Sequence, residues 1–153
     1  MNKHRIRLAA PTDAKAISQL MIPVVKKYVC NEYSKQGEQI IVSSMSAENI
    51  LTNINSEYRY TLAEINKKLV GVLGIKTENH IFHCFVDEKY HRQNIGQQLW
   101  HHWLNDANAS RVTVNSSKYA IKFYQSLGFI AVDEKFEKKG VVCHPMILQR
   151  TPI

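Results

Sequence analysis

The stretch from Ile81 to Trp100 constrains the fold of this chain most strongly, because its character changes twice over a short distance. Residues 81–86, IFHCFV, are apolar, aromatic and β-branched, which is typical of a buried strand. A polar loop follows from Asp87 to Gly96, and the residues after it place apolar side chains at helical spacing. The stretch therefore predicts a strand, a loop and a helix in that order.

A loop of this kind can bind an anion. The first backbone N–H groups of a helix have no partner within the helix and lie at the positive end of its dipole, which favours a phosphate or pyrophosphate. Gly96 would let a ligand approach the backbone closely, and Asn94 tolerates a left-handed conformation. His91 and Arg92 add hydrogen-bond donors. An ordinary strand-to-helix turn has the same composition, so this loop alone leaves both interpretations open.

A second stretch repeats the order of strand and helix. Residues 112–117, VTVNSS, predict a strand, and residues 119–129, YAIKFYQSLGF, predict a helix that stops at Gly128. Together the two stretches resemble the GNAT superfamily of acyl-CoA N-acyltransferases, which has a V-x-P-x-Y-[QR]-x-x-G-x-G/A loop and an A-x-x-x-Y-x-x-x-G-F helix. The residues that match these motifs are Val86, Tyr90, Gly96, Ala120, Tyr124, Gly128 and Phe129.

The chain departs from the loop motif at several positions. Glu88 stands where proline is usual, His91 where Gln or Arg is usual, and Asn94 where the first glycine is usual. Asn94 can supply the same backbone shape, and His91 still offers a donor. Gln98 occupies a position that is usually small.

Three further matches point to one bacterial branch of the superfamily: H-x-F-V at residues 83–86, V-N-S-S at 114–117 and P-M at 145–146. The resemblance implies a single GNAT acyltransferase domain over residues 1–153. It implies an α+β fold, layered α/β/α, in which a mixed, mostly antiparallel sheet of about six or seven strands lies between helices on both faces.

The resemblance also implies where coenzyme A would bind. Its pyrophosphate would lie on the loop, and its thioester would lie where the predicted strands at residues 81–86 and 111–115 part. A backbone N–H near Phe85 or Val86, freed from sheet pairing by a bulge, would polarise the thioester carbonyl. The expected coenzyme-binding residues are Phe85, Val86, His91, Arg92, Gln93, Asn94, Ile95, Gly96, Gln97, Asn115 and Ser117. Ser117 is equally suited to capping the following helix.

Three residues are candidates for catalysis. The family motif makes Tyr124 the general acid that protonates the departing thiolate, although the residue could instead be a core aromatic. His80 and His83 are candidates for the base that deprotonates the amine, with a water chain as the alternative, and either histidine could instead have a structural role. Strand alternation puts the two histidines on opposite faces of the sheet, so we expect at most one of them in the site.

The function implied is N-acetyl transfer from acetyl-CoA to a primary amine, by direct attack in a ternary complex with an unidentified acceptor. The alternative on the same fold is a non-catalytic acyl-CoA-binding or regulatory module. The early helical region would form one wall of the acceptor groove. Its polar and aromatic residues could recognise an amine or form a solvated helical face; they are Tyr28, Glu32, Tyr33, Gln36 and Glu38.

Composition sets limits on partners and location. Twenty Lys and Arg against 13 Asp and Glu give a formal charge of +7, which favours anionic partners such as coenzyme A. The basic residues are scattered, and no nucleic-acid-binding signature is present, so nucleic acid is an unlikely partner. The three cysteines have no metal-ligand or disulfide-framework spacing, so we expect no metal. No apolar run approaches a membrane span or signal segment, which predicts a cytoplasmic protein. The sequence leaves the oligomeric state open between a monomer and a homodimer.

The remaining pattern predicts the other elements. A strand at residues 5–9 leads into an amphipathic helix that should kink or break at Pro23, and residues 31–55 form a less regular helical region broken at Gly37, with a new helix start at Ser46. The later elements are a hairpin of residues 58–65 and 69–75, a strand at 80–86, a strand at 130–132, a charged hairpin tip at 134–140 and a strand at 141–148.

Overall fold

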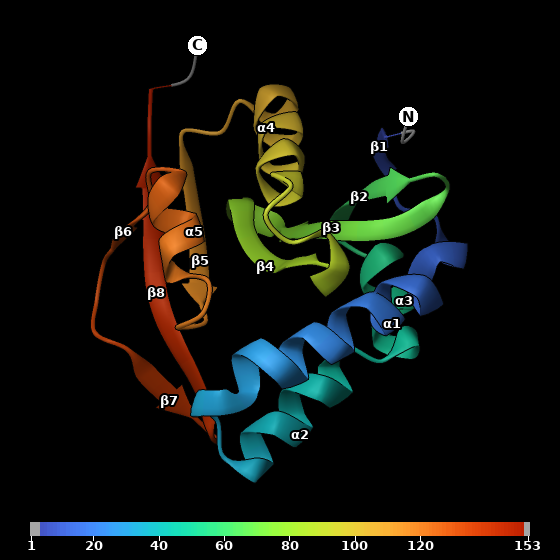
Figure 1. Ribbon diagram of the computed structural model, residues 1–153. Coiled ribbons are helices and arrows are strands. Elements are labelled where there is room, and N and C mark those ends of the chain that lie inside the picture. Colours follow the sequence, from blue (N-terminus) through green and yellow to red (C-terminus); the bar gives the residue numbers. More distant parts are fainter. Residues whose placement is uncertain (1–3, 152–153) are drawn as a thin grey trace.

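The computed structural model describes residues 4–151 and contains an eight-stranded sheet with the order β1-β2-β3-β4-β5-β8-β6, in which β7 also pairs with β8 (Figure 1). The strands are β1 (His4–Leu8), β2 (Arg59–Ile65), β3 (Lys68–Lys76), β4 (His80–Val86), β5 (Arg111–Ser116), β6 (Ile130–Ala131), β7 (Phe136–Lys138) and β8 (Val141–Gln149). The helices are α1 (Ala14–Val24), α2 (Lys35–Ser44), α3 (Ala47–Ile54), α4 (Ile95–Ala107) and α5 (Ile121–Ser126).

The sheet divides between β4 and β5, which form its parallel pair. These two strands pair only at His80 with Thr113 and at Ile81 with Val114, whereas β4 remains paired with β3 as far as Val86. Beyond Ile81 the two strands therefore diverge. Figure 1 shows the two halves of the sheet, with β1 to β4 on one side of the opening and β5 and β8 on the other.

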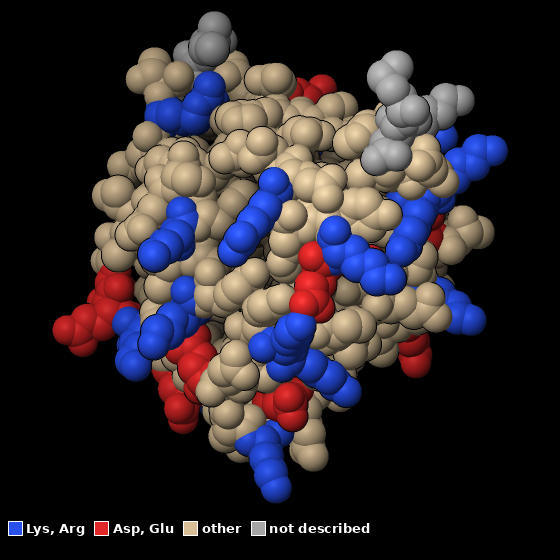
Figure 2. All heavy atoms as spheres, viewed as in Figure 1, with Lys and Arg blue, Asp and Glu red and all other residues tan. Residues whose placement is uncertain are grey.

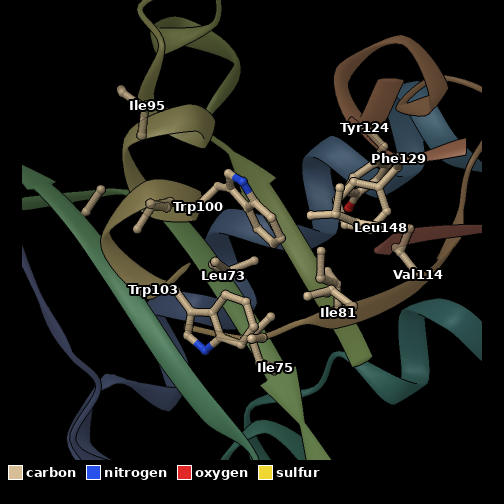
Figure 3. Packing of buried hydrophobic residues seen from close by; sticks show 14 of the residues in the cluster. Leu73, Ile75, Ile81, Ile95, Trp100, Trp103, Val114, Tyr124, Phe129 and Leu148 are labelled. Carbon is tan, nitrogen blue, oxygen red and sulfur yellow. The ribbon is translucent and has the colours of Figure 1, made fainter. Parts of the chain in front are cut away.

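Helices cover both faces of the sheet, as the fold class predicted. Trp100 and Trp103 of α4 pack over the sheet, and the ring of Trp100 meets that of Phe129, which in turn packs against Tyr124 of α5 (Figure 3). On the opposite face, α1 and α3 pack against β2 and β3 through a second apolar cluster that includes Met21. Burying a large apolar side chain stabilises a fold by about 1.5–3 kcal/mol, so these two clusters hold the helices in place.

The hairpin and the helix starts form as the local sequence predicts. Asn66 and Lys67, both with positive φ, make the two-residue turn between β2 and β3. Ser46 caps α3 by accepting a hydrogen bond from the Asn49 N–H at 3.2 Å. The helix beginning at Ala14 changes after Pro23, which has no N–H to donate, and continues as a π-helical segment at Val25–Val29.

Two predictions about local structure were incomplete or wrong. The charged run at residues 134–140 is not all a hairpin tip, because Phe136–Lys138 forms β7 and pairs with β8, leaving Lys139 and Gly140 as the turn. Gly37 does not break the helical region but lies inside α2. A Cβ at Gly37 would come within 2.0 Å of the Gly140 carbonyl oxygen, so this glycine permits close contact between two backbones.

Candidate active site

A groove of about 950 Å³ opens where β4 and β5 part. Its lining includes Cys84 and Tyr124 from the α4 and α5 face of the sheet, and Val25 and Met45 from the α1 and α3 face. The groove therefore passes through the opening between the strands, and side chains from both faces of the sheet line it. Pockets of 300–1,000 Å³ are typical of small-molecule sites.

The N-terminus of α4 lies at one end of this groove. Asn94 precedes the helix in a left-handed conformation with φ 61°, and Arg92 is also left-handed with φ 66°. Gln98 makes the first bond of the helix by donating to the Asn94 carbonyl at 3.0 Å. The N–H groups of residues 95–97 are therefore left for a partner outside the helix, as an anion site requires.

Gly96 also contacts the neighbouring helix. A Cβ at this position would lie 3.0 Å from the Phe123 ring of α5, which is closer than most Cβ contacts. From the sequence, we expected Gly96 to let a ligand approach the backbone closely. The structure adds that α4 and α5 can pack this closely because position 96 carries no side chain.

A bulge in β4 sets the positions of both histidines. Gly74 pairs with His83 and Ile75 with Ile81, so Phe82 is the extra residue. The bulge reverses strand alternation, and Ile81 and Cys84 pack in the same apolar cluster.

His80 and His83 consequently lie on the same face, and the prediction that they lie on opposite faces was wrong. His83 contacts Tyr60, which belongs to the α1 and α3 cluster. His80 contacts Thr113, whose neighbours Val112 and Val114 point into the other cluster. The bulge was expected near Phe85 or Val86 and instead lies at Phe82, where the register with β3 shifts.

The two histidines differ in access to the groove. His83 lines it, with Nδ1 at 3.0 Å from the Tyr60 hydroxyl and a side chain that is nearly fully buried. Burial lowers the pKa of His83 to about 3, so its ring is neutral near pH 7. His80 is not among the groove-lining residues; its Nδ1 lies 2.7 Å from Thr113 Oγ1, and burial together with Lys76 lowers its pKa.

Peptide groups of β4 point into the opening. The Asp87 N–H donates to the Val70 carbonyl of β3 at 2.8 Å, so by strand alternation the peptide groups of Val86 and Cys84 face the opposite way, toward the parting from β5. The Val86 carbonyl accepts a hydrogen bond from His91 Nε2 at 2.8 Å. Since a carbonyl can only accept, Nε2 carries the proton. Val86, rather than Phe85, has its N–H directed toward the groove.

Tyr124 combines a core position with access to the groove. Its ring packs edge-on against Phe123 and Phe129, with centroids 5.2 and 5.4 Å away. The Tyr124 side chain is hydrogen-bonded to the Cys84 thiol, and both residues line the groove. Burial is the main cause that raises the pKa of Tyr124 well above its usual value, so the phenol keeps its proton. Burial likewise raises the pKa of the Cys84 thiol to about 12.

An aromatic cluster borders the groove beside the loop. Tyr28 stacks on Tyr119 with a centroid distance of 4.6 Å, and His91 lies within 6.5 Å of both rings. Tyr28 also donates to Glu88 at 2.9 Å, and Lys27 forms an ion pair with the same carboxylate. These contacts join the segment after α1 to the loop and to the residues before α5.

Most of the residues predicted for the site line the groove. They are Tyr124, His83, Phe85, Val86, His91, Arg92, Asn94, Ile95, Gly96, Gln97, Asn115 and Ser117, whereas His80 and Gln93 are not among them. Ser117 Oγ accepts a hydrogen bond from the Ala120 N–H at 3.2 Å, so it also caps the turn before α5. Sequence reasoning missed Cys84, Tyr119, Lys122 and Phe123, which carry no local signal except their nearness to the motifs.

Of the early helical residues, Tyr28 and Tyr33 line the groove. Glu32 does not, because its carboxylate accepts from His144 Nε2 at 3.1 Å and from the Lys118 N–H at 3.0 Å. Within residues 4–151, no group of His, Cys, Asp and Glu side chains is arranged to hold a metal ion. In the same part of the chain, every helix is too short or too polar to cross a bilayer.

Comparisons with known proteins agree with this geometry. The structure of a GCN5-related N-acetyltransferase from Rhodopseudomonas palustris is similar with a TM-score of 0.81 and 17% identity, covering 95% of both chains. PaiA N-acetyltransferase from Thermoplasma acidophilum, solved in complex with coenzyme A, gives a TM-score of 0.80 and 16% identity over 97% of this chain and 99% of that one.

An aminoglycoside 6'-N-acetyltransferase, also solved with coenzyme A, gives a TM-score of 0.72 and 14% identity over 97% and 98% of the two chains. A search of curated proteins returned no match. The sequence profile of the acetyltransferase (GNAT) domain matches residues 29–150, most of the chain. The chain therefore belongs to the GNAT acetyltransferase family.

Proposed function

We propose that the protein transfers an acetyl group from acetyl-CoA to a primary amine by direct attack within a ternary complex. The observation that carries this proposal is the groove at the parting of β4 and β5, which joins the N-terminus of α4 to the Tyr124 side chain. Two structures of similar fold were solved with coenzyme A, which supports this choice of donor.

Each part of the donor has a matching group. The pyrophosphate lies against the N–H groups of residues 95–97, where the helix dipole favours negative charge. Arg92 and Lys122, which also line the groove, add positive charge. The pantetheine arm runs beside β4, and the Val86 N–H polarises the thioester carbonyl as negative charge develops on its oxygen.

The acceptor amine attacks the thioester carbon, the C–S bond breaks, and Tyr124 gives its phenolic proton to the departing thiolate. The proton that the acetylated nitrogen loses returns Tyr124 to its neutral form. Cys84 stays a neutral thiol, because burial keeps its pKa far above 7, and it does not compete as a nucleophile. This favours direct transfer over an acetyl-cysteine intermediate.

The proton of the incoming ammonium goes to solvent rather than to a histidine. His83, the histidine of the predicted pair that lines the groove, is a very weak base because it is buried. The apolar surroundings that lower its pKa also disfavour an ammonium group, so the amine itself loses its proton more readily on entering.

The experiment is an assay of thiol release from acetyl-CoA with a panel of primary amines, combined with mass spectrometry of the amine product. Release of one free coenzyme A for each molecule of N-acetylated amine formed supports acetyl transfer. Tight binding of acetyl-CoA without any amine-dependent release would instead identify the non-catalytic binding module, the alternative function on this fold.

A further inference from the structure

The half of the groove on the α1 and α3 face is built almost entirely from apolar and aromatic side chains. It receives residues from α1, the π-helical segment, α2 and β4, and several of them also belong to the apolar cluster on that face. They are Val24, Val25, Val29, Tyr33, Ile41, Met45, Phe82, His83 and Phe85, together with Asn115, an uncharged polar residue of β5.

Aromatic rings form the β4 side of this half. Phe82, the bulged residue, is 37% exposed and its ring centroid lies 4.4 Å from that of His83. Tyr58 meets Phe82 edge-on at 5.1 Å, which fixes the orientation of the exposed ring. An apolar ligand that covers Phe82 would gain the transfer free energy of its own surface and of the ring.

Negative charge is scarce in the groove. Among the described residues that line it, Glu88 supplies the one carboxylate, and Lys27 and Tyr28 already bind it at the loop end. Two nearby acids point elsewhere: Glu32 is bound by His144, and Glu38 is hydrogen-bonded to the Cys30 thiol. Figure 2, in the same view as Figure 1, shows acidic and basic side chains interspersed on the visible surface of the molecule, without a large acidic patch.

A second ammonium group would therefore lie in apolar surroundings without a carboxylate partner. Transfer of an unpaired ammonium from water into such surroundings is unfavourable. An amine on an apolar body places its one nitrogen at the thioester and its carbon chain or ring against Ile41, Met45 and Phe82.

On the basis of the proposed acetyl transfer, we infer that the acceptor is a primary monoamine carried on an apolar body, and that diamines and polyamines are poor acceptors. The apolar half of the groove is thus the specificity-determining surface. It selects for the part of the acceptor that does not react.

Hexylamine and hexamethylenediamine test this inference, because they share one chain and differ by the second amino group. We expect kcat/KM per amino group to be on the order of 10²-fold higher for hexylamine. Equal or better use of hexamethylenediamine by the wild-type protein would overturn the inference while leaving acetyl transfer intact.

A pair of variants on α2 provides the control. Ile41→Glu places a carboxylate in the apolar half and should shift the ratio of the two kcat/KM values toward the diamine by about tenfold. Ile40→Glu adds the same charge at the neighbouring, 39% exposed position, outside the groove lining, and should leave the ratio unchanged. A ratio that Ile41→Glu does not change, or that both variants change equally, contradicts the inference.

Binding separates this inference from the proposed function. If no amine supports thiol release, acetyl transfer fails, but calorimetry of the same two amines with the wild-type protein still decides the acceptor class. Tighter binding of hexylamine supports the inference. Equal or tighter binding of hexamethylenediamine overturns it.

Discussion

The Tyr124 side chain is part of the apolar core and also lines the groove. Its ring is part of the core between Phe123 and Phe129, and its hydroxyl reaches the Cys84 thiol at the groove. Replacing the ring would damage the fold, whereas removing only the hydroxyl leaves the packing in place.

For Tyr124→Phe we expect turnover to fall by about 10²–10⁴-fold, because the side chain loses the only proton it can deliver. Acetyl-CoA affinity should remain unchanged, and the free energy of unfolding should fall by about 1 kcal/mol for the lost hydrogen bond. Rates of thiol release and urea denaturation on one preparation measure both. Turnover near that of the wild type would remove Tyr124 from the mechanism.

His83 makes the stability of the protein depend on pH. Its pKa is depressed to about 3 in the folded state by burial, while the unfolded chain binds a proton near pH 6.5. Between these two values the unfolded state binds more protons, so the free energy of unfolding falls as the pH falls, by up to about 1.4 kcal/mol per pH unit.

We expect His83→Asn to flatten this dependence. Urea denaturation of wild type and variant at several pH values between 6.5 and 4 gives the slope of the free energy of unfolding against pH for each protein. Both proteins have the same carboxylates, so the contributions of these groups cancel in the difference between the two slopes. Parallel curves would show that His83 is not the titrating group. Above pH 6.5, protonation of His83 in the unfolded chain should no longer lower the free energy of unfolding of the wild type.

The start of α2 joins the two halves of the sheet at the end far from α4. Ser34 donates its N–H to the Gly140 carbonyl at 3.1 Å and caps α2 through its hydroxyl, which accepts from Gly37. Gly37 and Gly140 bring their backbones together at this contact. The β7–β8 turn therefore holds α2 against the C-terminal half of the sheet.

Gly37→Ala distinguishes this contact from helix propensity, because the two effects have opposite signs. Propensity predicts stabilisation of up to about 1 kcal/mol. The 2.0 Å approach of a new Cβ to the Gly140 oxygen predicts destabilisation by about 1–3 kcal/mol, and we expect this effect to dominate. Urea denaturation measures it, with Gln36→Ala at an exposed neighbouring position as the control. Stabilisation by Gly37→Ala would contradict the structure.

The packing of α4 on α5 gives a further prediction about acetyl-CoA binding. A Cβ at Gly96 points at the Phe123 ring, so Gly96→Ala should displace the N-terminus of α4 and weaken binding. Adding Phe123→Leu should make room and restore most of the affinity. Calorimetry on the single and double variants measures this. Persistent weakness in the double variant would show that the new methyl group obstructs the ligand directly and does not act through the packing of α4 on α5.

At the level of the entire chain, a ligand in the groove would contact both halves of the sheet and stabilise their arrangement. Acetyl-CoA at about 100 times its Kd should raise the free energy of unfolding by about 2.7 kcal/mol. Thermal denaturation should show this as an increase in Tm of roughly 5–10 °C. ADP, which has the pyrophosphate but no pantetheine arm, should give a smaller shift at the same concentration. Equal shifts would mean that the opening between β4 and β5 contributes nothing to binding.

Much of the fold could be predicted because its signals are local. The turn at Asn66 and Lys67, the cap at Ser46 and the strand, loop and helix ending in α4 depend on interactions between residues a few positions apart. The motif spacing around Gly96 and Tyr124 was sufficient to predict the family.

The tertiary structure decided the features that join distant segments. The bulge at Phe82 depends on the register between β3 and β4, and it put both histidines on one face against strand alternation. The depressed pKa of His83 follows from burial, and the contact of Gly37 with Gly140 and the stacking of Tyr28 on Tyr119 join residues about a hundred positions apart. Short-range chemistry determines turns, caps and periodicity, whereas registers, burial and long-range contacts exist only once the chain has folded.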